Sequence, residues 1–299
     1  MTLLSPSASA ARLMKVSTMR SFASSPRFRL AALGVLLTGL TGPAAADTPR
    51  PAADAPLQAA PGVTALSGRV MSVEGEPLVN VALRDGTVGT RTDAQGRFLL
   101  TRVPPGLSVL TIDGRHASGD GKTDYGLFEI RVTAAAGGTT VLPYTSYLPK
   151  IDHAHDVTIP SPTTAEVVVT SAVLPGLELH IPAGSVLTDT DGKKVTRIGI
   201  TPFPLDRTPF PMPGHLEVPV HFTVQPGGAT VTGIDGQPRG IRVYYPNLTH
   251  QMPQARANLY EYDPFRNGWT QYGAGTVSAD GRQIIPDAAS QLSDLTGAM

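Results

Sequence analysis

Turn signals recur along this sequence at short intervals, and they constrain the fold more than any other feature. Between them lie short runs rich in Val, Ile, Leu, Thr and Tyr. The turn pairs are Asp85-Gly86, Gln95-Gly96, Pro105-Gly106, Asp113-Gly114, Asp191-Gly192, Asp235-Gly236 and Asp280-Gly281. Short β-favouring runs bounded by such turns are typical of antiparallel sandwiches. The sequence therefore predicts an all-β fold, with no amphipathic helix after the N-terminal region.

The composition predicts a folded chain without a nucleic-acid partner. Of 299 residues, 41% are hydrophobic, which is enough to bury ordinary cores. The 24 Lys and Arg residues balance 24 Asp and Glu residues, so no net field draws the chain onto nucleic acid or an anionic membrane. The chain has no cysteine, so its stability must come from packed cores rather than disulfides.

The first 46 residues have the layout of a secretory signal peptide. Arg27 and Arg29 precede the apolar run 30–40, and small residues that end at Ala46 supply a cleavage pattern. This run is shorter than the roughly 20 residues that a membrane-spanning helix needs. We expect a signal-peptide helix, with Met19 as a possible true start, and export to the periplasm, the cell surface or the medium. A retained anchor is the alternative.

Three segments are expected after the signal peptide. Residues 47–64 are rich in Pro and Ala and predict an extended linker. Residues 65–150 predict a compact β-sandwich, and residues 151–299 predict a second β-rich domain. Within the sandwich, Asp93 is placed to accept backbone N–H groups at the start of a turn, and Gly96 to take the positive φ that closes it.

Four phrases in the first segment resemble one known family. They are Ser67-Gly-Arg-Val70, Gly75-Glu-Pro-Leu-Val-Asn-Val81, Thr92-Asp-Ala-Gln-Gly-Arg-Phe98 and Pro105-Gly106. In this order they resemble the carboxypeptidase regulatory-like domain, a transthyretin-like sandwich, over residues 65 to 113. In that family the module accompanies enzymes, surface receptors and adhesins without performing catalysis. The resemblance therefore implies a non-catalytic module.

Phrases in the second segment resemble the N-terminal region of long bacterial Rhs (YD-repeat) proteins over most of residues 143–299. They are Thr158-Ile-Pro-Ser-Pro-Thr-Thr164, Leu177-Glu-Leu-His-Ile-Pro-Ala-Gly-Ser-Val186, Arg197-Ile-Gly-Ile-Thr-Pro202, Val243-Tyr-Tyr-Pro-Asn247 and the stretch from Gly268 to Pro286. In that family this region follows a regulatory-like domain and precedes a shell of β repeats. It resembles the plug that closes one end of the shell in the related teneurins.

The YD repeats themselves do not follow in this sequence. Tyr260-Glu-Tyr-Asp263 is a single such phrase, whereas repeat architectures need several stacked units to bury a core. We expect either a truncated form of a longer protein or a separate accessory subunit. The implied partner is a YD-repeat shell protein or domain.

Candidate chemical sites in the sequence are weak. His153, His155 and Asp156 suit a metal if the segment is a strand, because alternate residues of a strand share a face. A polar linker between domains is the favoured interpretation, and we expect no metal or other cofactor.

The aspartates of loops 113–124 and 189–192 are candidates for weak calcium binding, although turn chemistry also explains them. Neither a G-x-S-x-G motif nor a thiol is present, so we expect no enzyme, although paired carboxylates are assembled in space rather than in sequence.

The last fifth of the chain is rich in aromatic residues, which are the candidate binding residues. They are Tyr244, Tyr245, Tyr260, Tyr262, Phe265, Trp269 and Tyr272. They predict either a platform that stacks on sugars or docks a partner, or the core of a sandwich.

We therefore expect an exported, non-catalytic binding and scaffold protein that packs against a β shell. The alternatives are a stand-alone cell-surface module that binds polysaccharide or mediates adhesion, and an envelope hydrolase with a regulatory-like domain.

Overall fold

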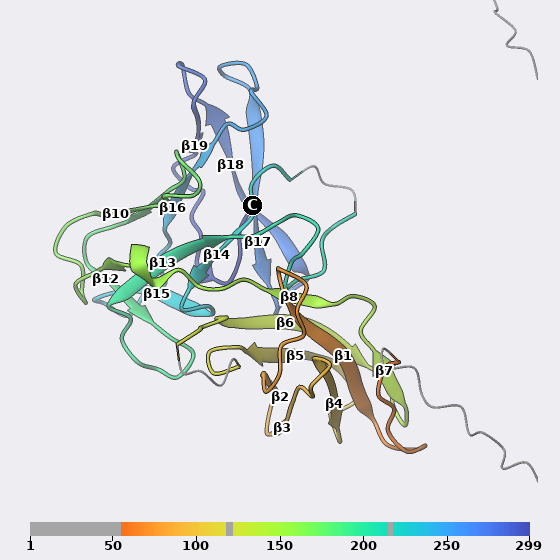
Figure 1. The fold of residues 1–299 in the computed structure, drawn as a ribbon. Coiled ribbons are helices and arrows are strands. Elements are labelled where there is room, and N and C mark those ends of the chain that lie inside the picture. The colour runs from red at the N-terminus through yellow and green to blue at the C-terminus, as the bar shows by residue number, and fades with distance from the viewer. Residues whose placement is uncertain (1–54, 118–121, 215–217) are drawn as a thin grey trace, which may run out of the picture. The chain divides into compact units, whose positions relative to one another are not determined.

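The computed structural model describes residues 55–117, 122–214 and 218–299, which are almost entirely β structure (Figure 1). Within these ranges the one helical element is the 3-10 turn η1 (His153–His155). The predicted all-β sandwich fold is confirmed. No described helix is long and apolar enough to cross a membrane. The predicted signal peptide, residues 1–46, lies outside the described residues.

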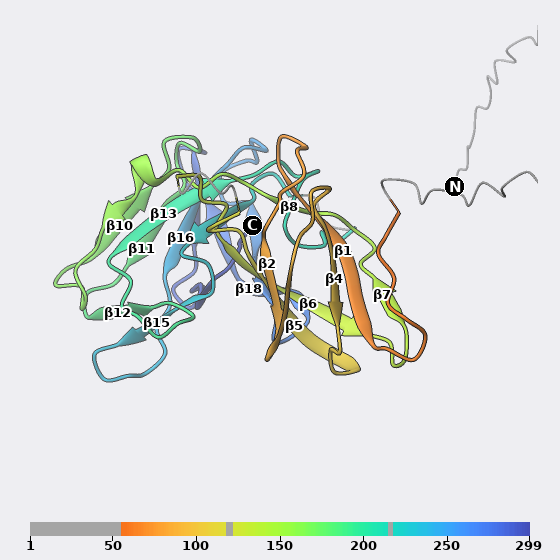
Figure 2. The same cartoon turned by 60° about the horizontal axis from the view of Figure 1, so that its bottom comes forward.

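The first part of the fold consists of two sheets (Figure 2). The two sheets share one cluster of buried apolar residues. One sheet has the order β4-β1-β7, with β8 also paired to β1, and the other has the order β3-β2-β5-β6. Their strands are β1 (Ala65–Ser72), β2 (Ala82–Asp85), β3 (Val88–Arg91), β4 (Arg97–Thr101), β5 (Gly106–Asp113), β6 (Leu127–Ala134), β7 (Thr139–Val141) and β8 (Ser146–Leu148). Alternate residues are buried, such as Phe98 and Leu100 in β4, so each strand presents one face to the cluster.

Side chains close the turn before β4 in the predicted way. Asp93 Oδ1 accepts the backbone N–H groups of Gln95 and Arg97, each at 2.9 Å. Gly96 has a φ of +71°, and a Cβ at this position would collide with the carbonyl oxygen of Val70. The turn therefore requires glycine both for its φ and for the close approach of β1.

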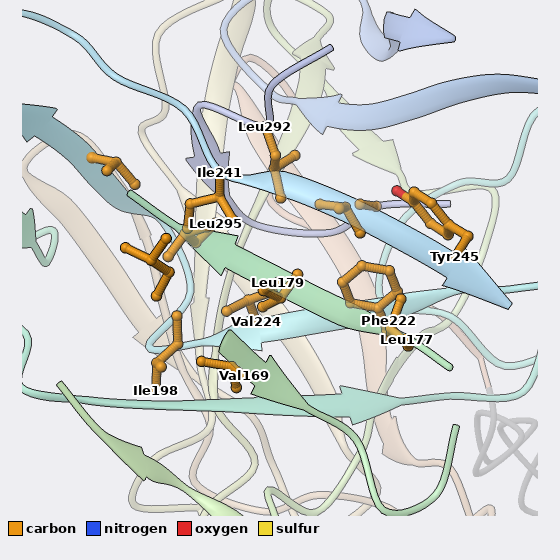
Figure 3. Close-up of a cluster of buried hydrophobic side chains, with 14 of the residues drawn as sticks. Val169, Leu177, Leu179, Ile198, Phe222, Val224, Ile241, Tyr245, Leu292 and Leu295 are labelled. Atoms are coloured by element: carbon orange, nitrogen blue, oxygen red, sulfur yellow. The ribbon is translucent and has the colours of Figure 1, made fainter. Parts of the chain in front are cut away.

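The second part consists of three sheets around another apolar cluster (Figure 3). The longest sheet has the order β10-β11-β16-β19-β18-β17, and the other two have the orders β12-β15-β20 and β14-β13-β9. The strands are β9 (Val157–Thr158), β10 (Val167–Thr170), β11 (Glu178–Ile181), β12 (Ser185–Thr188), β13 (Arg197–Pro202), β14 (Phe222–Gln225), β15 (Ala229–Gly233), β16 (Arg242–Pro246), β17 (Arg256–Asp263), β18 (Gly268–Val277), β19 (Gln283–Pro286) and β20 (Asp294–Leu295). Val169 of β10 and Leu259 of β17 come from the two edges of the longest sheet and both join the cluster, so this sheet curls around it.

Residues 297–299, here called the C-terminal segment, join two of these sheets. Phe222 and Ala298 exchange backbone hydrogen bonds of 3.2 and 3.0 Å. Tyr260 and Met299 exchange another pair, of 2.9 and 3.0 Å. The segment therefore lies extended between β14 and β17, antiparallel to both. It satisfies backbone groups that would otherwise form two open sheet edges.

An aromatic cluster crosses the predicted boundary at residue 150. We call it the aromatic seam, and it consists of Phe128, Phe203, Phe210, Tyr262 and Trp269. Phe210 stacks on Tyr262 with ring centroids 4.3 Å apart and meets Phe128 of β6 edge-on at 5.8 Å. The Tyr262 hydroxyl accepts the backbone N–H of Arg131 at 3.0 Å. The two predicted domains thus share apolar contacts, and the described residues from 55 onward belong to one compact unit.

Loss of the seam's central ring is expected to destabilise the whole unit. Phe210 is 1% exposed, so Phe210→Ala should lower the free energy of unfolding by about 3–5 kcal/mol. Phe265 is 71% exposed, so Phe265→Ala should change it by less than about 0.5 kcal/mol. Urea denaturation followed by tryptophan fluorescence measures both. Equal effects of the two substitutions would contradict a buried role for Phe210.

Candidate functional site

The seven candidate aromatic residues occupy different environments. Tyr245 and Tyr262 are buried, at 3% and 1% exposure, whereas Phe265 is 71% exposed. The half-buried members are Tyr244, Tyr260, Trp269 and Tyr272. Tyr262 and Trp269 belong to the aromatic seam. Tyr245 belongs to the second apolar cluster, where its ring centroid lies 5.9 Å from that of Phe222. The seven side chains are therefore divided between the interior and the surface and do not make one continuous platform.

Tyr244 belongs to a small polar and aromatic patch on the longest sheet. Its ring centroid lies 4.3 Å from that of His180, and the guanidinium carbon of Arg242 lies 5.3 Å from it. His180 in turn makes hydrogen bonds of 3.1 Å to Glu166 and 3.0 Å to Glu178. Cation–π and histidine–carboxylate contacts thus hold Tyr244 at the surface of the sheet.

One buried carboxyl group was missed by sequence reasoning. Glu261 is 6% exposed, and its Oε2 atom has no hydrogen-bond partner among the described residues. Burial and then the charge of Asp294 raise the pKa of Glu261 to about 7. The signal that could have found it is the alternation of β17, which places Glu261 on the same face as the buried Leu259. Tyr262 is buried on the opposite face, in the aromatic seam.

A cavity of about 250 Å³ opens beside the N-terminal half of β17, between residues 218–220 and 256–260. We call it the edge cavity. Its apolar lining includes Val218, Val220, Tyr245, Ala257, Leu259 and Ile284. Met299 also lines it, so the C-terminal segment leads directly into the cavity. Glu261 is not among the lining residues, so the buried carboxyl group lies outside this cavity.

The strand on which a metal site at His153 and His155 would depend does not form. These residues form η1, because the Asp152 side chain accepts the Ala154 backbone N–H and caps the turn. The two imidazoles consequently contact different groups: His155 bonds to Asp152, and His153 bonds to the two carboxylates described below. Across the described residues, no group of three His, Asp or Glu side chains is arranged to hold a metal ion.

His153 lies between two carboxylates. Its Nδ1 atom is 2.9 Å from Asp156 and its Nε2 atom is 2.9 Å from Asp124. Both ring nitrogens can donate only in the imidazolium form. Partial burial lowers the pKa of His153, but the hydrogen bonds to Asp156 and Asp124 outweigh it and raise the pKa above its usual value. This bridge connects the loop after β5 to the segment before β9.

In the two loops considered for calcium binding, Asp189 and Asp113 have partners within the protein. Asp189 Oδ1 accepts the backbone N–H groups of Asp191 and Lys193, at 3.0 and 2.8 Å. Asp113 forms a two-point ion pair with Arg115, at 2.9 and 2.8 Å. Residues 118–121 of the same loop lie outside the described residues.

Comparisons with known proteins give no family. No protein-family model matches this sequence, and no curated protein matches it. Among solved structures, the Bacillus anthracis TIE protein matches over 80% of this chain, with 12% sequence identity and a TM-score of 0.24. This chain spans 48% of the length of that chain. A likeness at this level carries no argument about function.

Glu261 is expected to make stability depend on pH. Its pKa rises from 4.5 to about 7 on folding, so the folded state loses stability as pH increases through that window. At pH 8 the ionised group should cost roughly 3 kcal/mol, so Glu261→Gln should raise the free energy of unfolding there and change it little at pH 4. Urea denaturation at both pH values measures this. Glu76→Gln, at an exposed position, is the control, and an equal gain at pH 4 would contradict the assignment.

His153 should titrate above its ordinary range. Its pKa is raised by two carboxylates, so its contribution to stability is present below about pH 6.5 and is lost as pH rises through the higher folded pKa. NMR titration of the imidazole signals measures the midpoint. Asp124→Asn should lower that midpoint, with the exposed His250 as an internal reference. An unchanged midpoint in Asp124→Asn would show that the bridge does not form in solution.

Proposed function

We propose that this chain is an exported, non-catalytic binding and scaffold protein that packs against a partner β structure. In this proposal it acts as the plug-like N-terminal portion of an Rhs (YD-repeat) protein. The resemblance of the phrases in residues 65–113 and 143–299 supports the family. The observation that carries the mechanism is the end of the longest sheet at β17, where an apolar cavity borders the strand.

Open sheet edges are natural docking sites for other β structure. An unpaired strand presents donors and acceptors in a row, and apolar surface beside it supplies the burial that makes the association stable. The edge cavity provides both at one place. The aromatic seam joins the two parts, because the first sandwich and the second part share buried rings.

The polysaccharide-binding alternative has weaker support. Sugar-binding platforms need aromatic faces open to solvent, and Tyr245 and Tyr262 are at most 3% exposed. Phe265 is the most exposed of the seven residues and does not belong to the aromatic seam.

Affinity capture distinguishes the two functions. Residues 47–299, with a tag at the N-terminal end so that the edge cavity stays open, are immobilised and exposed to the native envelope fraction. We expect a protein with YD repeats to be retained and identified by mass spectrometry. The heat-denatured chain is the control for non-specific adsorption. Retention of polysaccharide without any YD-repeat protein would overturn the proposed function in favour of the surface module.

A further inference from the structure

We propose that Asp124, His153 and Asp156, here called the histidine bridge, form a pH-dependent switch between the two parts of the fold. As an imidazolium ion, His153 holds Asp124 of the first part to Asp156, which is fixed on the second part. When the ion loses its proton, His153 keeps Asp156 and releases Asp124. This inference goes beyond the proposed function, because it assigns a conformational response to pH and requires no partner.

One end of the histidine bridge is held firmly on β13. The Arg197 guanidinium of this strand donates to the carbonyl oxygen of His153 at 3.2 Å and lies 3.7 Å from the Asp156 carboxylate. Asp156 Oδ1 also lies directly against Gly199, where a Cβ atom would overlap it. The side chain of Asp156 is 9% exposed. His153 and Asp156 therefore belong to the second part and have little room to move.

The other end, Asp124, lies on the loop between β5 and β6 of the first part. Its Oδ2 atom is 2.9 Å from His153 Nε2, and its Oδ1 atom accepts the backbone N–H of Gly126 at 2.6 Å. Its carbonyl oxygen accepts the N–H of Ile151 at 2.8 Å, so this amide reports on the same contact region. The Asp124 side chain is 25% exposed, so its carboxylate can turn to water, whereas that of Asp156 is enclosed.

The number of protons on His153 decides whether both contacts persist. The two carboxylates lie at opposite ring nitrogens, so each needs its own N–H donor, and only the imidazolium ion has two. In the neutral ring, one nitrogen presents a lone pair to a carboxylate oxygen, and that contact becomes repulsive. Because Asp156 is fixed on β13, the remaining proton stays at Nδ1, and the repulsion acts on Asp124.

The other titratable and charged groups on the elements around His153 already have partners within the protein. They are Asp152 and His155 at η1, which bond to each other, Arg115 of the loop after β5, which pairs with Asp113, and Arg197, which contacts Asp156. Gln225 lines the same cavity of about 310 Å³ and carries no charge. Among the described residues, none of these groups donates a hydrogen bond to Asp124 Oδ2 in place of His153.

Amide hydrogen exchange in residues 47–299 measures the switch. The probe is the Ile151 amide, and the reference is the Arg131 amide, which donates to the Tyr262 hydroxyl between the two parts without a charged partner. Protection factors, corrected for intrinsic exchange, are compared at about pH 5.5 and about pH 8.5. We expect the ratio of Ile151 to Arg131 protection to fall about tenfold for each unit by which the pKa of His153 exceeds its ordinary value. An unchanged ratio would overturn the inference.

Two substitutions at Asp124 separate the switch from a purely structural contact. Asp124→Asn keeps the Oδ1 acceptor for Gly126 and places an NH2 group opposite the lone pair of neutral His153. The ratio of Ile151 to Arg131 protection should then stay high at about pH 8.5. Asp124→Ala offers neither donor nor acceptor, so it should give a low ratio at both pH values.

The Arg131 amide also shows whether each variant remains folded, because its hydrogen bond does not involve the histidine bridge. A fall of the ratio with pH in Asp124→Asn as large as in the unchanged protein would contradict the release of Asp124. A high ratio in Asp124→Ala at both pH values would show that the bridge does not hold the loop, and it would also overturn the inference.

Discussion

Backbone pairing on both sides of the C-terminal segment is the interaction on which the second part depends. The segment lies between Phe222 of β14 and Tyr260 of β17 and bonds to both. The Thr296 hydroxyl adds a bond of 2.5 Å to the carbonyl of Tyr262. Without these contacts, β14 and β17 would expose two rows of unpaired groups, and the apolar cluster between them would be open to water. Ala298 is fully buried, so the last residues belong to the core rather than to a tail.

The same segment links strand pairing to the aromatic seam through one glycine. A Cβ at Gly297 would lie 2.6 Å from the ring of Phe210, so any other residue displaces the ring that stacks on Tyr262. His221 borders the seam, with its ring centroid 5.1 Å from that of Trp269, and burial lowers the pKa of His221 to about 3. A substitution at position 297 would therefore disturb both the sheet junction and the core of the first sandwich.

Local chemistry in the sequence predicted the sandwich well, because a turn such as that of Asp93 and Gly96 is fixed by residues a few positions apart. The C-terminal junction could not be predicted in this way, since its partners at Phe222 and Tyr260 are remote in sequence and no local pattern encodes the register. The segment at His153 was interpreted as a polar linker, and the alternative of a strand with a shared metal-binding face does not form, because the Asp152 side chain caps a 3-10 turn there. Glu261 shares the buried face of β17 with Leu259, as strand alternation predicts, but the burial of Tyr262 on the opposite face depends on the remote ring of Phe210.

Two residues that commonly protect sheet edges border the edge cavity. Edge strands are commonly protected by charges or by proline, and here Arg256 and Pro219 both line the cavity. The guanidinium of Arg256 is turned to Asp287, with contacts of 2.8 and 2.6 Å, so its charge is not directed along the apolar floor. Pro219 borders the other wall and is exposed. With its charge paired to Asp287, Arg256 leaves apolar groups such as Val220 and Leu259 as the main lining of this edge, which is what the proposed docking of a β structure requires.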